Sequence, residues 1–221
     1  MYHYLDDKEF LHDMRKLSGA LMQSLCHHLK QDYDIGANFY LVGSGARNLI
    51  LQNADQPVDL DYNLEIVRCG KLDDCRYIKE CAIKSFNKAL REKHLGNCED
   101  STSSLTAKKI HITSGNQTEF SIDVCITKRD ASGQYYRLIH HKTGFTYYDT
   151  YYWTPAPQSD KIREKADYIK KHGQWDLVRE QYLKIKNRYL MWNDHHHPSF
   201  VCYVEVINNV YNSRPSWQGG I

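Results

Sequence analysis

Three acidic residues are the part of this sequence best suited to chemistry. Asp59 and Asp61 stand one residue apart in VDLDYNLEIV, and Asp123 lies in the apolar segment FSIDVCI. Side chains alternate along a strand, so Asp59 and Asp61 point to the same face. If Asp123 lies beside them, three carboxylates share one site and repel one another unless a cation neutralises them. Oxygen ligands of this kind suit Mg²⁺ or Mn²⁺.

A small-residue turn precedes the aspartates. GSGARN, residues 43–48, lies between an apolar strand and the start of a short helix. Gly43 and Gly45 let the backbone approach a ligand closely, and backbone amides with the Ser44 hydroxyl are suited to phosphate oxygens. The segment lacks the Gly-Lys-Ser/Thr of a Walker loop and also lacks GxGxxG. Turn and carboxylates together predict a site for metal and phosphate.

Each acidic residue also has a structural interpretation. Asp59 and Asp61 could be solvated charges on an edge strand, and Asp123 could form a salt bridge. Ser44 could cap the short helix, a role compatible with phosphate contact.

Basic residues near the turn and the third aspartate are further candidates. Arg47, in the first helical turn, is suited either to phosphate or to an acidic neighbour. Lys109 and His111 alternate with Ile110 and Ile112. If the isoleucines face the core, Lys109 and His111 share the Asp123 face, where phosphate contact competes with simple solvation.

The remaining pattern supplies the elements that position the site. Apolar residues three and four apart predict helices over residues 7–31, 72–94, 173–193 and about 198–211. Strands are expected over 38–43, 58–67, 105–113 and 118–127, with the last two joined as a hairpin by SGNQ. Residues 46–53 are expected as a helical turn or two, and 134–153 as an extended aromatic hairpin or loop.

This order predicts an α+β fold, in which helices flank a mixed sheet and a helical C-terminal lobe follows. The expected domains are a catalytic domain over residues 1–153 and a helical lobe over 154–221.

Composition fits a globular protein and restricts its partners only weakly. The 221 residues are 41% hydrophobic and 25% charged, with a net charge of +2, which does not require a nucleic-acid partner. Seven cysteines form no CxxC pair, which favours free thiols in a reducing compartment, so a cytoplasmic location is expected. No signal pattern or apolar run of about 18 residues is present, so no membrane association is expected.

Three short motifs carry a resemblance when they are taken in order. LVGS (41–44), DLDY (59–62) and IDV (122–124) resemble the DNA-polymerase-β-like nucleotidyltransferase superfamily, in particular its small bacterial members. VGSGARNLI also resembles the corresponding loop of tRNA CCA-adding enzymes and small antibiotic adenylyltransferases.

The resemblance implies a role for each matching residue. Asp59 and Asp61 would bind both metal ions and the nucleotide phosphates, and Asp123 would complete the metal site. Gly43 and Ser44 would hold the triphosphate.

Gly45, Arg47 and Lys109 are expected as further nucleotide contacts. The implied reaction is attack of an acceptor hydroxyl on the α-phosphorus of an NTP, with ATP the expected donor and pyrophosphate leaving. The acceptor is expected to be a small molecule, a protein side chain or an RNA end.

Two other functions remain open from the sequence. The fold could bind a nucleotide or a protein partner without turnover, as an antitoxin-like regulatory subunit. Residues 158–192 carry nine Lys/Arg against five Asp/Glu, so these helices could bind nucleic acid, although a solvated face explains them too. The histidines of NDHHHPSF fit a helix start better than a zinc site, because adjacent histidines rarely converge on one ion.

Overall fold

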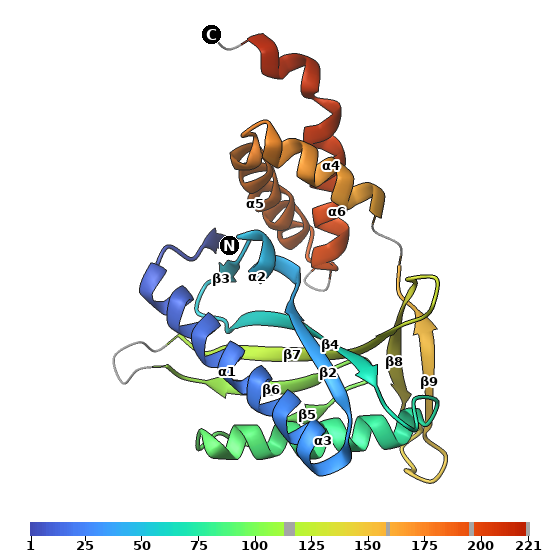
Figure 1. The fold of residues 1–221 in the computed structure, drawn as a ribbon. Coiled ribbons are helices and arrows are strands. Elements are labelled where there is room, and N and C mark those ends of the chain that lie inside the picture. The colour runs from blue at the N-terminus through green and yellow to red at the C-terminus, as the bar shows by residue number, and fades with distance from the viewer. Residues whose placement is uncertain (113–117, 158–159, 195–196, 220–221) are drawn as a thin grey trace. The chain divides into compact units, whose positions relative to one another are not determined.

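The computed structural model describes residues 1–112, 118–157, 160–194 and 197–219, and Figure 1 shows the course of the chain. The SGNQ loop and two of the adjacent histidines, 195 and 196, lie outside the described residues. The chain forms two units. The sheet unit comprises Asp6–Ala46 and Gln56–Ala156, and the helical unit comprises Met1–Leu5, Arg47–Asp55 and Pro157–Ile221.

The two units are not separated by a single boundary near residue 153, because two N-terminal segments belong to the helical unit. β1 (Tyr2–Tyr4) pairs antiparallel with β3 (Leu51–Asn53), with Tyr2 opposite Asn53. The Tyr2 backbone N–H also donates to Asn187 Oδ1 at 2.7 Å. These bonds tie both short segments to the C-terminal helices.

The sheet unit contains a mixed sheet. Its strands are β2 (Gly36–Leu41), β4 (Val58–Arg68), β5 (Glu99–Asp100), β6 (Leu105–Ile110), β7 (Phe120–Arg129), β8 (Tyr135–His141) and β9 (Thr150–Pro155). Their order is β2-β4-β7-β6-β5, and β8 joins β7 to β9. Only β4 and β7 pair in parallel among the described ladders. The expectation of an α+β fold with a mixed sheet is confirmed.

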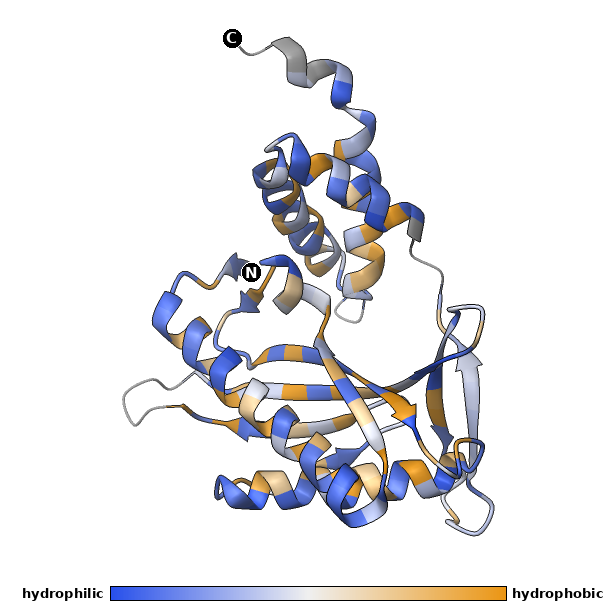
Figure 2. Ribbon diagram, in the orientation of Figure 1, coloured by the Kyte–Doolittle hydropathy of each residue, from blue (hydrophilic) through white to orange (hydrophobic). Residues whose placement is uncertain are grey.

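Alternation along β4 and β7 separates a core face from a polar face, and Figure 2 shows the change of hydropathy along the strands. Leu60, Tyr62, Ile122 and Val124 are buried on the core face. Helix α1 (Lys8–Tyr33) packs there, with the Phe10 ring edge-on to Phe120 at 6.4 Å.

The two long helices of this unit begin at acidic caps. The Asp7 side chain accepts from the Phe10 backbone N–H at 2.9 Å at the start of α1. Asp74 accepts from the Tyr77 N–H at the same distance at the start of α3 (Cys75–Glu92). Each cap satisfies a backbone donor that the first helical turn leaves unpaired.

Besides β1 and β3, the helical unit contains α4 (Asp160–Lys171), α5 (Trp175–Met191), α6 (Ser199–Asn212) and the 3₁₀ helix η1 (Arg214–Gly219). Its core includes Ile169, Val178, Tyr182 and Val206. Residues 46–53 are not one helical segment, because α2 (Gly43–Arg47) ends before β3 begins. No helix in the described part of the chain is both long and apolar enough to cross a membrane.

Candidate active site on the polar face of the sheet

The three predicted aspartates lie on one face of the central parallel pair. In the β4–β7 ladder Asp61 is directly opposite Asp123, and Asp59 is opposite Ser121. Paired residues of parallel strands project to the same side, and this side is opposite the core face. The strands thus bring together three carboxylates from segments about 60 residues apart in sequence.

Neighbouring hydroxyls orient two of these carboxylates. Ser121 Oγ donates to Asp59 Oδ1, and Thr106 Oγ1 donates to Asp123 Oδ1. Thr106 lies on β6, directly opposite Asp123. Sequence reasoning did not identify these two donors. Ser121 could have been found, because alternation along the strand places it on the Asp123 face. Thr106 could not, because its position beside Asp123 depends on the register of β6 on β7.

The electrostatic state of Asp123 reflects this crowding. Burial raises the pKa of its carboxyl group above the ordinary value, and the charge of Asp59 raises it further. The hydrogen bond from Thr106 and the charge of Lys108 act in the opposite direction. A cation close to the carboxylate would favour its charged form.

The glycine turn lies directly against Asp61. Gly43 has a φ of +63°, and a Cβ at this position would collide with Asp61 Oδ2 and lie 2.9 Å from Asp61 Cγ. The Val42 backbone N–H donates to the Asp61 carbonyl oxygen at 2.8 Å. Glycine is therefore needed for both conformation and space, and the predicted turn and the predicted carboxylate share one location.

Gly45 is a glycine for a different reason from the one predicted. A Cβ here would lie 2.8 Å from Leu60 Cδ2 and 3.2 Å from Leu41 Cδ1, in the buried core. Its hydrogen atom makes room for apolar packing. Ser44 is half-buried beside it, in a helix of five residues.

The alternation used to place Lys109 on the Asp123 face is interrupted at this residue. The β6–β7 register shifts between Ala107 and Ile110, and Lys109 has a φ of +56° in this bulge. A bulge inserts a residue and changes which side chains face the same way. Lys108 is the lysine whose charge acts on Asp123, and it also pairs with Glu99 at 2.6 Å.

Arg47 contacts an aromatic ring within the helical unit. Its guanidinium carbon lies 4.1 Å from the centroid of the Tyr203 ring, and its carbonyl oxygen accepts from Trp175 Nε1 at 3.1 Å. Burial raises the pKa of Tyr203, while the Arg47 charge and hydrogen bond lower it. The alternatives considered from the sequence, phosphate or an acidic neighbour, did not include this partner.

Arg137 is a cation on the polar face that the sequence did not single out. It lies opposite Thr127 in the β7–β8 ladder, and its charge lowers the pKa of Cys125, which burial raises. Its Nε atom is buried and has no hydrogen-bond partner among the described residues.

The donor set suits a hard cation, although the side chains are not gathered around one point. Among the described residues no group of three His, Cys, Asp or Glu side chains lies close enough to hold a metal ion. Two of the three aspartates are turned toward the hydroxyls instead. Asp61 and Asp123 are opposite each other on neighbouring strands, which lie about 4.8 Å apart.

The zinc interpretation of the histidines receives no support from the described residue among them. The His197 ring stacks on Tyr189 with centroids 3.5 Å apart, and its Nδ1 lies 2.8 Å from Asp194 Oδ2. It immediately precedes Pro198, the N-cap of α6.

Comparison with known proteins shows what the fold is. No protein-family model matches the sequence, and no curated protein is significantly similar to it. CdnC of E. coli MS115-1, solved with ATP, is 16% identical with a TM-score of 0.54, covering 91% of this chain and 61% of its own. Vibrio cholerae DncV with GTP bound is 14% identical with a TM-score of 0.52, covering 93% and 53%.

A cyclic dinucleotide synthase, Elizabethkingia meningoseptica CdnE with GTP and Apcpp, has a TM-score of 0.50 and 13% identity, covering 89% and 69%. The chain thus spans between about half and seven tenths of these proteins. The likeness shows the fold, and this chain has the nucleotidyltransferase fold that the sequence predicted.

Proposed function

We propose that this protein is a metal-dependent nucleotidyltransferase that transfers NMP from an NTP to a hydroxyl group and releases pyrophosphate. One observation carries the proposal: Asp61 faces Asp123 across the parallel strands and also lies against Gly43 of the turn. Carboxylates for a cation and a turn for phosphate therefore occupy one place. ATP is the donor we put first, and the ATP-bound and GTP-bound neighbours support an NTP donor.

Each residue has a role in this reaction. Asp59, Asp61 and Asp123 would hold Mg²⁺ or Mn²⁺, which supplies charge neutralisation at the phosphates. The backbone amides of Gly43 and Ser44, with the Ser44 hydroxyl, would bind phosphate oxygens. Because α2 has only five residues, we assign phosphate binding to the backbone of the turn itself rather than to a helix dipole.

The hydroxyl donors have a positioning role. Ser121 and Thr106 would hold the Asp59 and Asp123 carboxylates in fixed orientations. Asp123, with its raised pKa, is suited to accept the proton that the attacking hydroxyl loses. Positioning and charge neutralisation would supply most of the rate enhancement.

The acceptor that we put first is a nucleotide hydroxyl, because one protein of the same fold is a cyclic dinucleotide synthase. Small molecules, protein side chains and RNA ends are the other acceptors to test. Labelled NTPs with Mg²⁺ or Mn²⁺ should yield labelled product and pyrophosphate with one of these classes.

The assigned site is tested by neutralising Asp61. Asp61→Asn should lower the transfer rate by about 10²- to 10³-fold, since a charge-stabilising group is lost. Asp73→Asn is the matched control, because the Asp73 side chain is fully exposed and should leave the rate unchanged. Transfer at the normal rate by Asp61→Asn would refute the assigned site, and NTP binding without pyrophosphate release by the unaltered protein would favour a regulatory function.

A further inference from the structure

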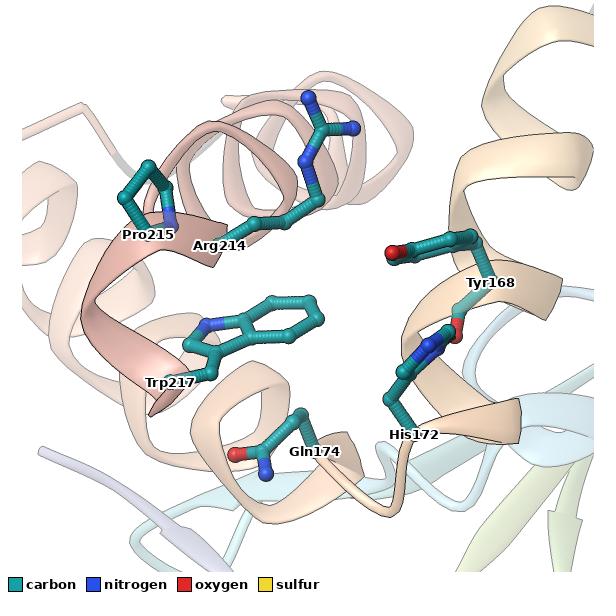
Figure 3. Close-up of a pocket in the computed structure, with 6 residues that line it drawn as sticks. All are labelled: Tyr168, His172, Gln174, Arg214, Pro215 and Trp217. Carbon is teal, nitrogen blue, oxygen red and sulfur yellow. Dashed lines mark hydrogen bonds between the residues drawn. The ribbon is translucent and has the colours of Figure 1, made fainter. Parts of the chain in front are cut away.

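A pocket of about 510 Å³ lies within the helical unit, between the last turn of α4 and η1 (Figure 3). It is lined by Tyr168, His172, Gln174, Arg214, Pro215 and Trp217. Its volume falls within the range of small-molecule sites, roughly 300–1,000 Å³. None of these residues belongs to the sheet unit, which contains the carboxylates.

Trp217 forms one aromatic wall of the pocket, and Tyr168 with His172 stacked on it forms the other. The centroids of Trp217 and Tyr168 are 6.3 Å apart, and their planes are inclined by 32°. A flat ring between them needs roughly 7 Å, twice the ~3.5 Å contact distance of carbon atoms. A widening of roughly 1 Å therefore admits an aromatic ring in contact with both walls.

Neighbouring side chains support both walls. The His172 ring stacks on Tyr168 with centroids 4.1 Å apart, and the Tyr211 ring meets Tyr168 edge-on at 5.4 Å. Trp217 Nε1 donates to Ser213 Oγ at 3.3 Å. These contacts limit the orientations that the two rings can adopt, which lowers the entropic cost of binding between them.

The polar groups at the pocket favour an anionic ligand. Arg214 lies over the Tyr211 ring at 3.6 Å and over the Tyr168 ring at 5.7 Å. Among the described residues no acidic side chain lines the pocket or pairs with Arg214. Gln174 adds an amide that both donates and accepts hydrogen bonds, as the edge of a heteroaromatic ring requires.

We propose that this pocket binds a nucleoside monophosphate, with its base between Trp217 and Tyr168 and its phosphate on Arg214. A flat heteroaromatic ring fits between the aromatic walls and can hydrogen-bond to the Gln174 amide, and one anionic group joined to it can pair with the Arg214 guanidinium. The base of a single-stranded RNA has the same chemistry, but the limited volume of the pocket and the single described guanidinium in its lining favour the free nucleotide. This assignment does not depend on the proposed transfer reaction.

Titration calorimetry with AMP and GMP tests the proposal, with ribose 5-phosphate and adenosine as probes of each half. Trp217→Ala should weaken binding roughly 5- to 150-fold, the range found when a stacking side chain is removed. Trp217→Phe should recover most of the affinity, and Arg214→Gln should weaken AMP more than adenosine. Trp192→Ala is the matched control, because this exposed tryptophan of the same unit does not line the pocket.

The outcomes separate this site from the proposed active site. Asp59→Asn/Asp61→Asn should leave AMP binding intact while transfer is lost. Thermal unfolding of Trp217→Ala shows whether this variant is folded, and Trp217→Phe serves as a second variant that keeps an aromatic ring at this position. AMP binding that is unchanged in both Trp217→Ala and Arg214→Gln would overturn the proposal. Binding of oligoadenylate much more tightly than AMP, lost in the same variants, would also overturn it and assign the pocket to RNA.

Discussion

Replacement of Gly43 by alanine tests whether the turn and the carboxylate act as one site. At a φ of +63° an alanine costs about 1–2 kcal/mol. Its Cβ would also meet the Asp61 carboxylate, so the side chain of Asp61 must rotate away. For a chain of this size, the strain alone lowers the melting temperature by roughly 2–8 °C.

A strain-matched control separates the two effects. Gly173 has a φ of +68°, and a Cβ there would meet nothing within 4 Å. Gly173→Ala should therefore show a similar fall in melting temperature with normal transfer. Gly43→Ala should lose transfer about as severely as Asp61→Asn, in the range of roughly 10²- to 10³-fold.

A third variant isolates the collision from the strain. Asparagine tolerates positive φ better than alanine but carries the same Cβ, so Gly43→Asn should still lose transfer. Initial rates of pyrophosphate release, measured at saturating NTP and alongside thermal unfolding, give both quantities for each variant. Normal transfer by Gly43→Ala would refute the inferred dependence on this contact.

Three further predictions concern the charges of the sheet unit. Asp123→Asn should raise the melting temperature near neutral pH while it reduces transfer. Burial raises the Asp123 pKa, so the charged carboxylate lowers the stability of the folded protein above that pKa. The gain in melting temperature should therefore vanish as the pH falls below the ordinary carboxyl pKa. A gain that grows at acidic pH would contradict this sign. Thr106→Val removes a hydrogen bond that lowers the Asp123 pKa, so the acidic limb of the pH–rate profile should move to higher pH, and an unmoved limb would contradict the assigned coupling. Lys79→Met should cost about 1–3 kcal/mol in urea unfolding, since it removes the buried partner of Asp100 at 2.9 Å while His140 remains beside that carboxylate, whereas Lys30→Met at an exposed pair should cost under about 1 kcal/mol.

The parts of the site predicted from sequence are those governed by local alternation. Asp59 and Asp61 were placed on one face by the period of a strand, and the register on β7 brings Asp123 beside Asp61. Gly43 was assigned to a turn from its type, and its positive φ agrees with that assignment. These inferences need only one strand or one turn at a time.

The parts that were missed depend on pairings that no short segment encodes. The bulge at Lys109 shifts the register of β6, so simple alternation counted back from Ile110 does not hold there. β3 was interpreted as helix because it is three residues long and is defined by its partner β1, about 50 residues earlier. Arg47 follows a glycine turn, but its partner Tyr203 lies far along the chain.

The charged side chains of the sheet unit lie in two different electrostatic environments. Near β5 and β8 the charges are compensated: Lys79 pairs with Asp100 at 2.9 Å, and His140 lies between Asp100 and Asp149 at 2.7 and 3.0 Å. Such a network satisfies each buried charge locally, as folding stability requires.

Asp59 and Asp123 are not compensated in this way. Asp59 and Asp123 accept hydrogen bonds from neutral hydroxyls, and no described Lys or Arg forms an ion pair with either. The pKa of Asp123 is raised as a consequence, because burial and the like charge of Asp59 both act on its carboxyl group. A paired lysine would relieve this cost, as Lys79 does elsewhere in the same unit, but it would also cancel the negative potential of the face. A cation bound by these aspartates requires that potential, so the uncompensated charge favours a catalytic rather than a structural origin for the site.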